Sequence, residues 1–563
     1  MFKKNKRHIQ PPLISEVSQL PERQFSRLER SWAGVFYREV FSRLDENAFS
    51  CLYSDLPSRP NIPVNVLVGL EFMKSGFGWS DEQLYDEFLY NVQVRYALGY
   101  HQLGEGEFDL RSLYYFRQRL SQYMQKEGVN LLEQAFEQVT DEQLAKFQLK
   151  TGKQRMDSTQ IASNIRQHGR LQLLVEVLQR VPRMLTETDQ ARYAELLKPF
   201  MQGHPGWYVY KMKQSEFPEH IRRVGWVMHQ LLTELKANYA QYKEYQVLER
   251  VFSEHYRMDK SEVVPKAQKE LGANSLQSPD DWEATIREVG SGLKQGYVAN
   301  LAETCDPENP FQLITKIQVA PNSTDDGKLL LQALPNLAER TDLDTLYTDG
   351  GYGGAKLDQA LTDHGVVLFQ TGIRGKKLRQ DKLSFYHFSI HQDETSLPIQ
   401  VTCPYGQIAP VEAGSQKKGY VARFSVSICE TCPFHQARKC PTRLRKRKQF
   451  YGLYFMPSKM LLALRRQRNE VFQTSRRNPR AAVEATVRAV KLPFPKGKLP
   501  VRGRFRMFYM MIGSAAINNV RQIQRYLSSK LRNPDPDSFL TSVSRVYFYA
   551  KSCISASFVF IKP

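Results

Sequence analysis

The segment TLYTDGGYGG (residues 345–354) is a short apolar run that ends at Asp349 and continues into a glycine-rich stretch. We interpret it as a strand followed by a flexible turn. Open sheets place reactive groups at such strand ends, where side chains leave the core and meet solvent. An acid before Gly-Gly is more often a plain turn residue, so Asp349 alone indicates little.

A second acid has a similar setting. Asp157, in RMDST (residues 155–159), lies on or just after a strand-like run over residues 153–157. In residues 313–319 apolar and polar side chains alternate, which is the period of a strand with one covered face. Further runs cover residues 297–303, 345–348 and 366–370. These five runs predict a mixed α/β fold class, with one mixed sheet flanked by helices.

The rest of the sequence is largely of helical period. We predict an N-terminal helical domain over residues 12–125 and a helical insertion in the sheet domain over about 165–294. In the first, a helix over 64–74 ends at a Gly-Phe-Gly turn, and Ser80 then opens a capping box. Two helices around a glycine turn suit a helix-turn-helix, and an ordinary α-hairpin fits the pattern equally well.

Basic side chains are in excess, with 79 Lys and Arg against 58 Asp and Glu and a formal net charge of +21. This excess favours a polyanionic partner, although ribosomal and membrane-surface proteins share it. In the N-terminal domain, a helix opened by Asp109 carries Arg117 and Arg119 among aromatic side chains. That mixture suits a DNA backbone, and it also suits a solvated helix packed by its aromatic side.

The length of the chain and its cysteines indicate how many domains to expect and in which compartment the protein works. A chain of 563 residues is too long for one core and should divide into about two to four domains. The N-terminus lacks the apolar stretch of a signal peptide, and residues 546–561 are too short and too interrupted for a membrane span. Seven cysteines do not form a disulfide scaffold in so long a chain. We therefore expect a cytoplasmic protein without a membrane partner.

A third acid, Glu484, lies in NPRAAVEATVRAVK (residues 478–491). On a helix, Arg480, Glu484, Arg488 and Lys491 share one face beside a valine stripe. A glutamate among arginines at helical spacing is usually a surface ion pair. The order and setting of the three acids together outweigh that simpler reading.

This pattern resembles the DDE transposases of bacterial insertion sequences: strand-Asp, strand-Asp-Gly, then a helix with Arg, Glu and Lys. The chain is similar to the branch with a helical N-terminal domain, an RNase H-like catalytic domain and a cysteine-bearing insertion. The resemblance covers roughly residues 12–527 and includes PVNVL (63–67), FRQRL (116–120), ETCD (303–306) and YTDGGY (347–352). One departure is Arg477, because many relatives have a tyrosine at that place.

The resemblance implies a catalytic domain over residues 150–527, followed by a tail over 528–563. It implies Mg²⁺ (or Mn²⁺) held by Asp157, Asp349 and Glu484, which would cleave and join DNA at the inverted ends of the element. The implied DNA contacts are Arg480, Lys491, Arg488, Arg117 and Arg119. The implied partner is double-stranded DNA, both element ends and target, bound by a homo-oligomer in the nucleoid.

Four cysteines lie within about residues 395–448, namely Cys403, Cys429, Cys432 and Cys440. The C-x-x-C pair suits a tetrahedral Zn²⁺, and the other two thiols could complete a structural site. Buried free thiols and a redox dithiol are the alternatives. The basic run RLRKRK (443–448) follows and is expected to track the DNA backbone.

Two other functions fit the same residues. One is a transposase-derived DNA-binding protein without catalysis, which should have lost an acid, whereas all three are present. The other is a stand-alone RNase H-like nuclease. The sequence separates this second alternative poorly, because cleavage and strand transfer use one site.

Overall fold

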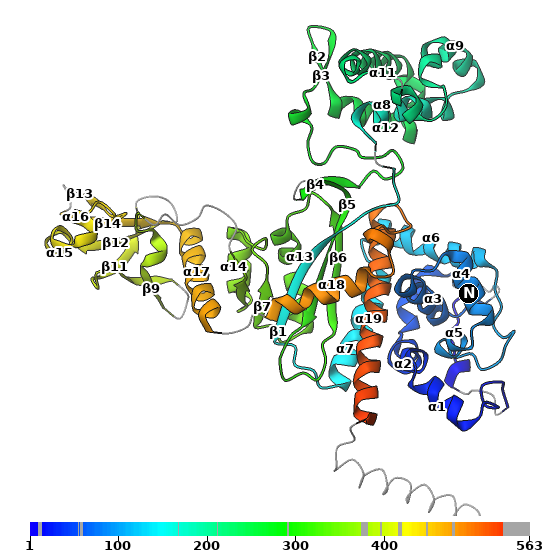
Figure 1. The fold of residues 1–563 in the computed structure, drawn as a ribbon, viewed down its shortest axis with the longest axis horizontal. Coiled ribbons are helices and arrows are strands. Elements are labelled where there is room, and N and C mark those ends of the chain that lie inside the picture. Colours follow the sequence, from blue (N-terminus) through cyan, green and yellow to red (C-terminus); the bar gives the residue numbers. More distant parts are fainter. Residues whose placement is uncertain are drawn as a thin grey trace, which may run out of the picture. The chain divides into compact units, whose positions relative to one another are not determined.

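The computed structural model describes residues 1–9, 14–54, 56, 60–166, 168–210, 212–289, 292–372, 381–393, 397–414, 419–445, 449–475 and 479–532. The chain forms two compact units (Figure 1). One unit contains residues 1–150, 307–314 and 512–532, and the other contains residues 151–306 and 315–511. The predicted tail over 528–563 lies outside the described residues from 533 onward.

The first unit is helical. Its helices are α1 (Glu22–Arg30), α2 (Trp32–Glu39), α3 (Val64–Phe77), α4 (Asp81–Tyr90), α5 (Val92–Ala97), α6 (Leu110–Glu127), α7 (Leu131–Lys146) and the C-terminal part of α19 (Arg504–Arg532). Gly78 ends α3 in the left-handed conformation (φ 74°), and Ser80 and Gln83 form the expected capping box of α4. Because glycine reaches that φ without strain, the turn at residue 78 suits it.

Helix α3 is the centre of this unit, since every residue from Val64 to Gly76 is buried. Glycines allow its neighbours to approach closely. A Cβ added to Gly76 would lie 2.2 Å from the side chain of Ile517 in α19, and one added to Gly513 would lie 2.7 Å from Ser75. The close contact of α3 with α19 therefore requires glycine, which has no side chain, at residues 76 and 513.

The second unit contains a six-stranded mixed sheet, which confirms the predicted α/β fold class. Its strands are β4 (Thr285–Val289), β5 (Gly292–Thr304), β1 (Lys153–Ile161), β7 (Thr345–Thr348) and β8 (Val367–Gln370) in spatial order, with β6 (Ile314–Pro321) paired to β5. Strand β1 is antiparallel to β5 and parallel to β7, and β7 is parallel to β8. Leucines of α13 (Asp326–Arg340) and α14 (Ala355–Asp363) pack into the sheet core with Met156.

Between β1 and β4 lies a set of helices with its own apolar core, which includes Leu174, Val224, Leu231 and Leu248. The elements are α8 (Arg170–Arg180), α9 (Glu187–Leu197), α10 (Pro205–Tyr210), α11 (Phe217–Tyr239), α12 (Lys243–His255) and the hairpin of β2 (Tyr256–Asp259) and β3 (Glu262–Pro265). They fall within the range predicted for the helical insertion.

A second, antiparallel sheet contains the cysteines. Its strands are β9 (Ser389–Gln392), β10 (Pro398–Thr402), β11 (Ile408–Ala413), β12 (Tyr420–Ser425), β13 (Arg443–Arg445) and β14 (Phe450–Phe455), with the short helices α15 (Val426–Thr431) and α16 (Pro433–Gln436). Then follow α17 (Pro457–Ser475) and α18 (Val483–Lys491). Within the described ranges, every helix is too short or too polar to cross a bilayer.

We expect Gly76→Ala to destabilise the chain, because the new methyl group overlaps Ile517. Overpacking of this kind costs about 1–3 kcal/mol, so the melting temperature should fall by at least about 3 °C in calorimetry. The matched control is Gly272→Ala, where the nearest atom to the added Cβ is 4.0 Å away. If the two variants melt together, the close packing of α3 against α19 is wrong.

Candidate active site

The pairing of β1 with β7 brings two predicted acids to one sheet edge. The last paired residues of these parallel strands are Arg155 and Tyr347. Asp157 and Asp349 each follow two residues later, so the same register places them across from each other. Neighbouring strands are about 4.8 Å apart. Asp157 is 7% exposed, which keeps its carboxylate at the border of the core.

The glycine turn after β7 is held by hydrogen bonds between side chains and the backbone. The Gly351 amide donates to Asp349 Oδ1 at 2.8 Å, and the Gln370 side-chain amide donates to the carbonyl of Tyr352 at 2.6 Å. Gly327, at the start of α13, meets the same turn: a Cβ there would lie 2.7 Å from the Gly353 carbonyl oxygen. The turn therefore has a defined position beside α13, despite its glycines.

A third carboxylate joins the two aspartates around the buried side chain of Tyr352. The pKa of this phenol is raised well above its usual value, first by burial and then by the charges of Asp326, Asp157 and Asp349. Asp326 accepts a hydrogen bond from Ser158 Oγ at 2.8 Å and lies 3.4 Å from the Arg287 guanidinium. Sequence reasoning missed Asp326, because an acid in the first turn of a helix is ordinary capping chemistry.

Helix α18 is attached to the sheet at two points, one on β5 and one on β1. Thr486 donates to Glu303 Oε2 at 2.8 Å, and the other oxygen of this buried carboxylate pairs with Arg155 at 2.7 Å. Further along the helix, the Lys491 amine donates to Thr159 Oγ1 and to the Gln160 carbonyl, each at 3.0 Å. Alternate strand residues share one face, so Arg155, Asp157 and Thr159 lie on the side that α18 covers.

Glu484 lies in the first turn of α18 and is exposed. The structure thus brings Asp157 and Asp349 together on adjacent strands and places Glu484 on the helix that lies along one of them. Among the described residues, no three His, Cys, Asp or Glu side chains form a group that could hold a metal ion. The predicted three-carboxylate ligand set remains a prediction.

The predicted DNA contacts have different surroundings. Lys491 is half-buried against β1, and burial lowers the pKa of its amine, with the charge of Lys294 acting the same way. Arg488 is exposed on α18, and Arg480 lies in the short 3-10 helix Pro479–Ala482 before it. The predicted roles of these residues at DNA stay predictions.

In the first unit, the Arg117 guanidinium pairs with Glu71 at 2.6 Å and with Asp81 at 2.7 Å, and Lys74 joins Asp81 at 2.7 Å. Arg119 lies over the Tyr53 ring, 5.1 Å from its centroid. Arg117 therefore connects α6 to α3 and α4. Its predicted contact with DNA would have to share a guanidinium that already has two carboxylate partners.

The basic residues that precede Glu484 in the sequence also differ in their surroundings. Arg465 of α17 is buried and forms an ion pair with Asp358 of α14, so it stabilises the packing of two helices. Arg443 is exposed on β13. Residues 446–448 and Arg477 lie outside the described part of the chain.

The four predicted zinc ligands lie near one another in the cysteine-bearing sheet. Burial raises the pKa of the Cys429 thiol to about 12, and Cys440, Cys403 and Cys432 act in the same direction. All four thiols are free. Cys403 lies in the turn between β10 and β11, where its amide and carbonyl bond to Gln407 and Gly406, each at 2.9 Å. The thiols have not formed a closed metal-binding group in this structure.

Replacing Thr486 by valine tests the attachment of α18. The change removes a donor to the buried Glu303 carboxylate, and such bonds contribute about 1.5–3 kcal/mol. We expect a lower melting temperature than in Thr233→Val, which removes an exposed hydroxyl from α11. Equal melting of the two variants would show that the Thr486 contact does not fix the helix.

One comparison with known proteins gives a match. Residues 25–119 match the model of the family described as Transposase domain (DUF772). No curated protein and no solved structure matches the chain. The matched residues run from α1 into α6, so they lie in the helical first unit. The first unit of this chain is therefore similar to a transposase domain, which supports the predicted insertion-sequence transposase.

Proposed function

We propose that this chain is a DDE transposase that cleaves DNA at the inverted ends of an insertion sequence and joins those ends to target DNA. The observation that carries the proposal is the parallel register of β1 and β7, because its continuation beyond Arg155 and Tyr347 would pair Asp157 with Asp349. A central strand between an antiparallel and a parallel neighbour supports the RNase H-like catalytic domain that the resemblance implies. The transposase-domain match in residues 25–119 supports the same function independently.

The acids near the sheet edge are of the type that binds a hard divalent cation. The charges of Asp157, Asp349 and Asp326 all raise the pKa of Tyr352, so the three acids lie near one buried side chain. Like charges this close repel, and Mg²⁺ or Mn²⁺ prefers oxygen ligands of this kind. We propose Asp157 and Asp349 as ligands, with Glu484 as the third because Thr486 holds its helix to β5 and Lys491 holds it to β1.

When bound there, divalent cations would supply activation of the attacking oxygen and stabilisation of the leaving oxygen. The chain's own residues position the acids. The Gly351 amide orients the Asp349 carboxylate, and the Ser158 amide donates to Asp157 Oδ1 at 3.0 Å. Arg488 is exposed on the same helix as Glu484, so it is placed to contact a DNA phosphate.

The two alternatives are separated by activity. A transposase-derived DNA-binding protein would bind the element's end DNA without cutting it. A stand-alone nuclease would cut DNA but would not join a pre-cut 3′ end to a second duplex. Strand transfer of a labelled, pre-cut end into plasmid DNA is therefore the assay that distinguishes the proposed transposase from both.

We expect Asp157→Asn, Asp349→Asn and Glu484→Gln each to abolish Mg²⁺-dependent cleavage of a duplex carrying the element's end, because each removes a charged ligand. Binding of that duplex in a gel-shift assay should remain within about twofold of wild type. Asp363→Asn, an exposed acid in α14, is the matched control and should cleave normally. A variant that still cleaves removes its residue from the proposed site.

We also propose that Cys403, Cys429, Cys432 and Cys440 hold a structural Zn²⁺. The support is their common neighbourhood, seen in the joint effect of three thiols on the pKa of the fourth. Protein purified under reducing conditions should contain about one zinc per chain by mass spectrometry, as expected for a four-thiolate site. Cys432→Ser should lose the zinc, and Cys51→Ser, at an exposed thiol, should keep it. Fully active protein without zinc would contradict the proposal.

A further inference from the structure

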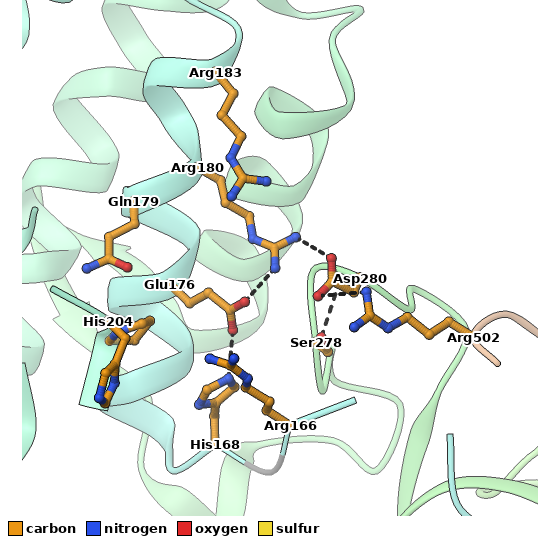
Figure 2. A pocket seen from close by; sticks show the side chains of 11 residues that line it. Arg166, His168, Glu176, Gln179, Arg180, Arg183, His204, Ser278, Asp280 and Arg502 are labelled. Atoms are coloured by element: carbon orange, nitrogen blue, oxygen red, sulfur yellow. Dashed lines mark hydrogen bonds and ion pairs between the residues drawn. The ribbon is translucent and has the colours of Figure 1, made fainter. Parts of the chain in front are cut away.

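The second unit contains a cavity of about 370 Å³ beside α8, and its lining includes none of the acids described above (Figure 2). Its described lining carries four arginines against two carboxylates, a net charge of +2 with histidines neutral. The arginines are Arg166, Arg180, Arg183 and Arg502. Three of them come from the chain after β1, the end of α8 and the short 3-10 turn that follows it, and Arg502 comes from the chain after α18.

Two acids fix two of the arginines. Arg180 reaches between Glu176 and Asp280, with its Nη1 atom 2.8 Å from Asp280 Oδ1 (Figure 2). Arg502 lies on the other oxygen of Asp280 at 3.3 Å, and its Nε donates to the Asn164 carbonyl at 2.7 Å. A guanidinium has five N–H donors, more than these contacts use. The acids therefore hold two forks in place and leave donors for an anion.

The positive surplus comes from Arg166 and Arg183. Both side chains are exposed, and no ion pair joins either of them to another described residue. In Figure 2 the side chains of Arg180 and Arg183 extend in the same general direction from the same stretch of chain. Guanidinium forks match the spacing of phosphate oxygens and bind them in pairs. The cavity thus combines two arginines held by acids with two arginines that have no ion-pair partner among the described residues. This combination suits phosphate groups.

The cavity is joined to the candidate active site by continuous backbone. Beyond β1 the chain stays extended beside residues 497–501: the Ala162 amide donates to the Gly497 carbonyl at 2.8 Å, and the Asn164 amide to the Val501 carbonyl at 3.0 Å. Nine residues separate Asp157 from Arg166, which an extended chain spans in at most about 30 Å. That is roughly nine base pairs of duplex at about 3.4 Å each, less than one helical turn.

We propose that this arginine pocket binds backbone phosphates of the DNA duplex within one turn of the scissile bond. The inference rests on the proposed function and deepens it, because it assigns to the helical insertion a part in holding the substrate. A free phosphate or pyrophosphate ion shares the chemistry and is the other source of the same ligand groups.

The test removes the two unpaired arginines, in Arg166→Gln/Arg183→Gln. The matched control is Arg222→Gln/Lys236→Gln, which removes two exposed cations of α11 in the same insertion. Binding of a fluorescein-labelled duplex to the full chain is followed by anisotropy at several salt concentrations without divalent metal. Calorimetry with inorganic phosphate and with pyrophosphate covers the free-ion source, and circular dichroism checks folding.

Each lost phosphate contact lowers the slope of log K against log salt by about 0.9. We expect the pocket variant to lose roughly 1–2 from the magnitude of the slope and to bind about tenfold more weakly, with the control close to wild type. If the pocket variant and the control lose the same slope and affinity, the loss reflects only the change in net charge, and the proposal is overturned. Unchanged duplex binding would overturn it too, including the case where only binding of the free ion is lost.

The two proposals fail in different ways. If the pocket variant loses slope as expected but Asp157→Asn still cleaves DNA, the metal site is wrong and the pocket stands. If Asp157→Asn is inactive but the pocket variant binds the duplex like wild type, the pocket is wrong and the catalytic proposal stands.

Discussion

Parallel pairing of β1 with β7 is the constraint on which the candidate active site depends. Side chains two residues beyond a matched pair in parallel strands remain neighbours, and both positions here are aspartates. Carboxylates gathered in this way repel one another unless a cation joins them. The surrounding structure keeps them together: Gln370 holds the glycine turn, and Gly327 lets α13 approach it. The register of β1 and β7 thus concentrates negative charge at one edge of the sheet.

The chain as a whole is strongly basic. Its arginines in the structure are of two kinds, those paired with carboxylates inside the fold and those exposed at the surface. Arg117, Arg155 and Arg465 are paired with buried or half-buried carboxylates, so their charges serve packing. Arg166, Arg183 and Arg488 are exposed. Cations of the second kind can replace counterions along DNA without losing a partner, whereas the first kind would have to share or give up an existing one. The overall charge of +21 therefore overstates what any one surface offers.

Much of the fold could be predicted from the sequence, because its signals are local. The alternation in residues 313–319, the apolar run before Asp349 and the capping box at Ser80 each depend on a few neighbouring residues, and strands or helices form at all three places. Helix α18 is shorter than the predicted one, because residues 479–482 form a 3-10 turn and leave Arg480 outside it. The candidate site could be predicted less completely from the sequence. Asp326 looks like a helix cap in the sequence. Asp358, the partner of Arg465, and Asp280, one of two partners of Arg180, lie about 100 residues away, where no local pattern reveals them.

The central claim is that Asp157, Asp349 and Glu484 share bound divalent cations. Cleavage of the protein backbone tests it most directly: Fe²⁺ bound in place of Mg²⁺ reduces added hydrogen peroxide to hydroxyl radicals, which cut close to the ion. The account predicts cuts near residues 157, 349 and 484 in one experiment, all suppressed by excess Mg²⁺. Cuts elsewhere, or near 157 and 349 but never near 484 even with end DNA bound, would contradict it.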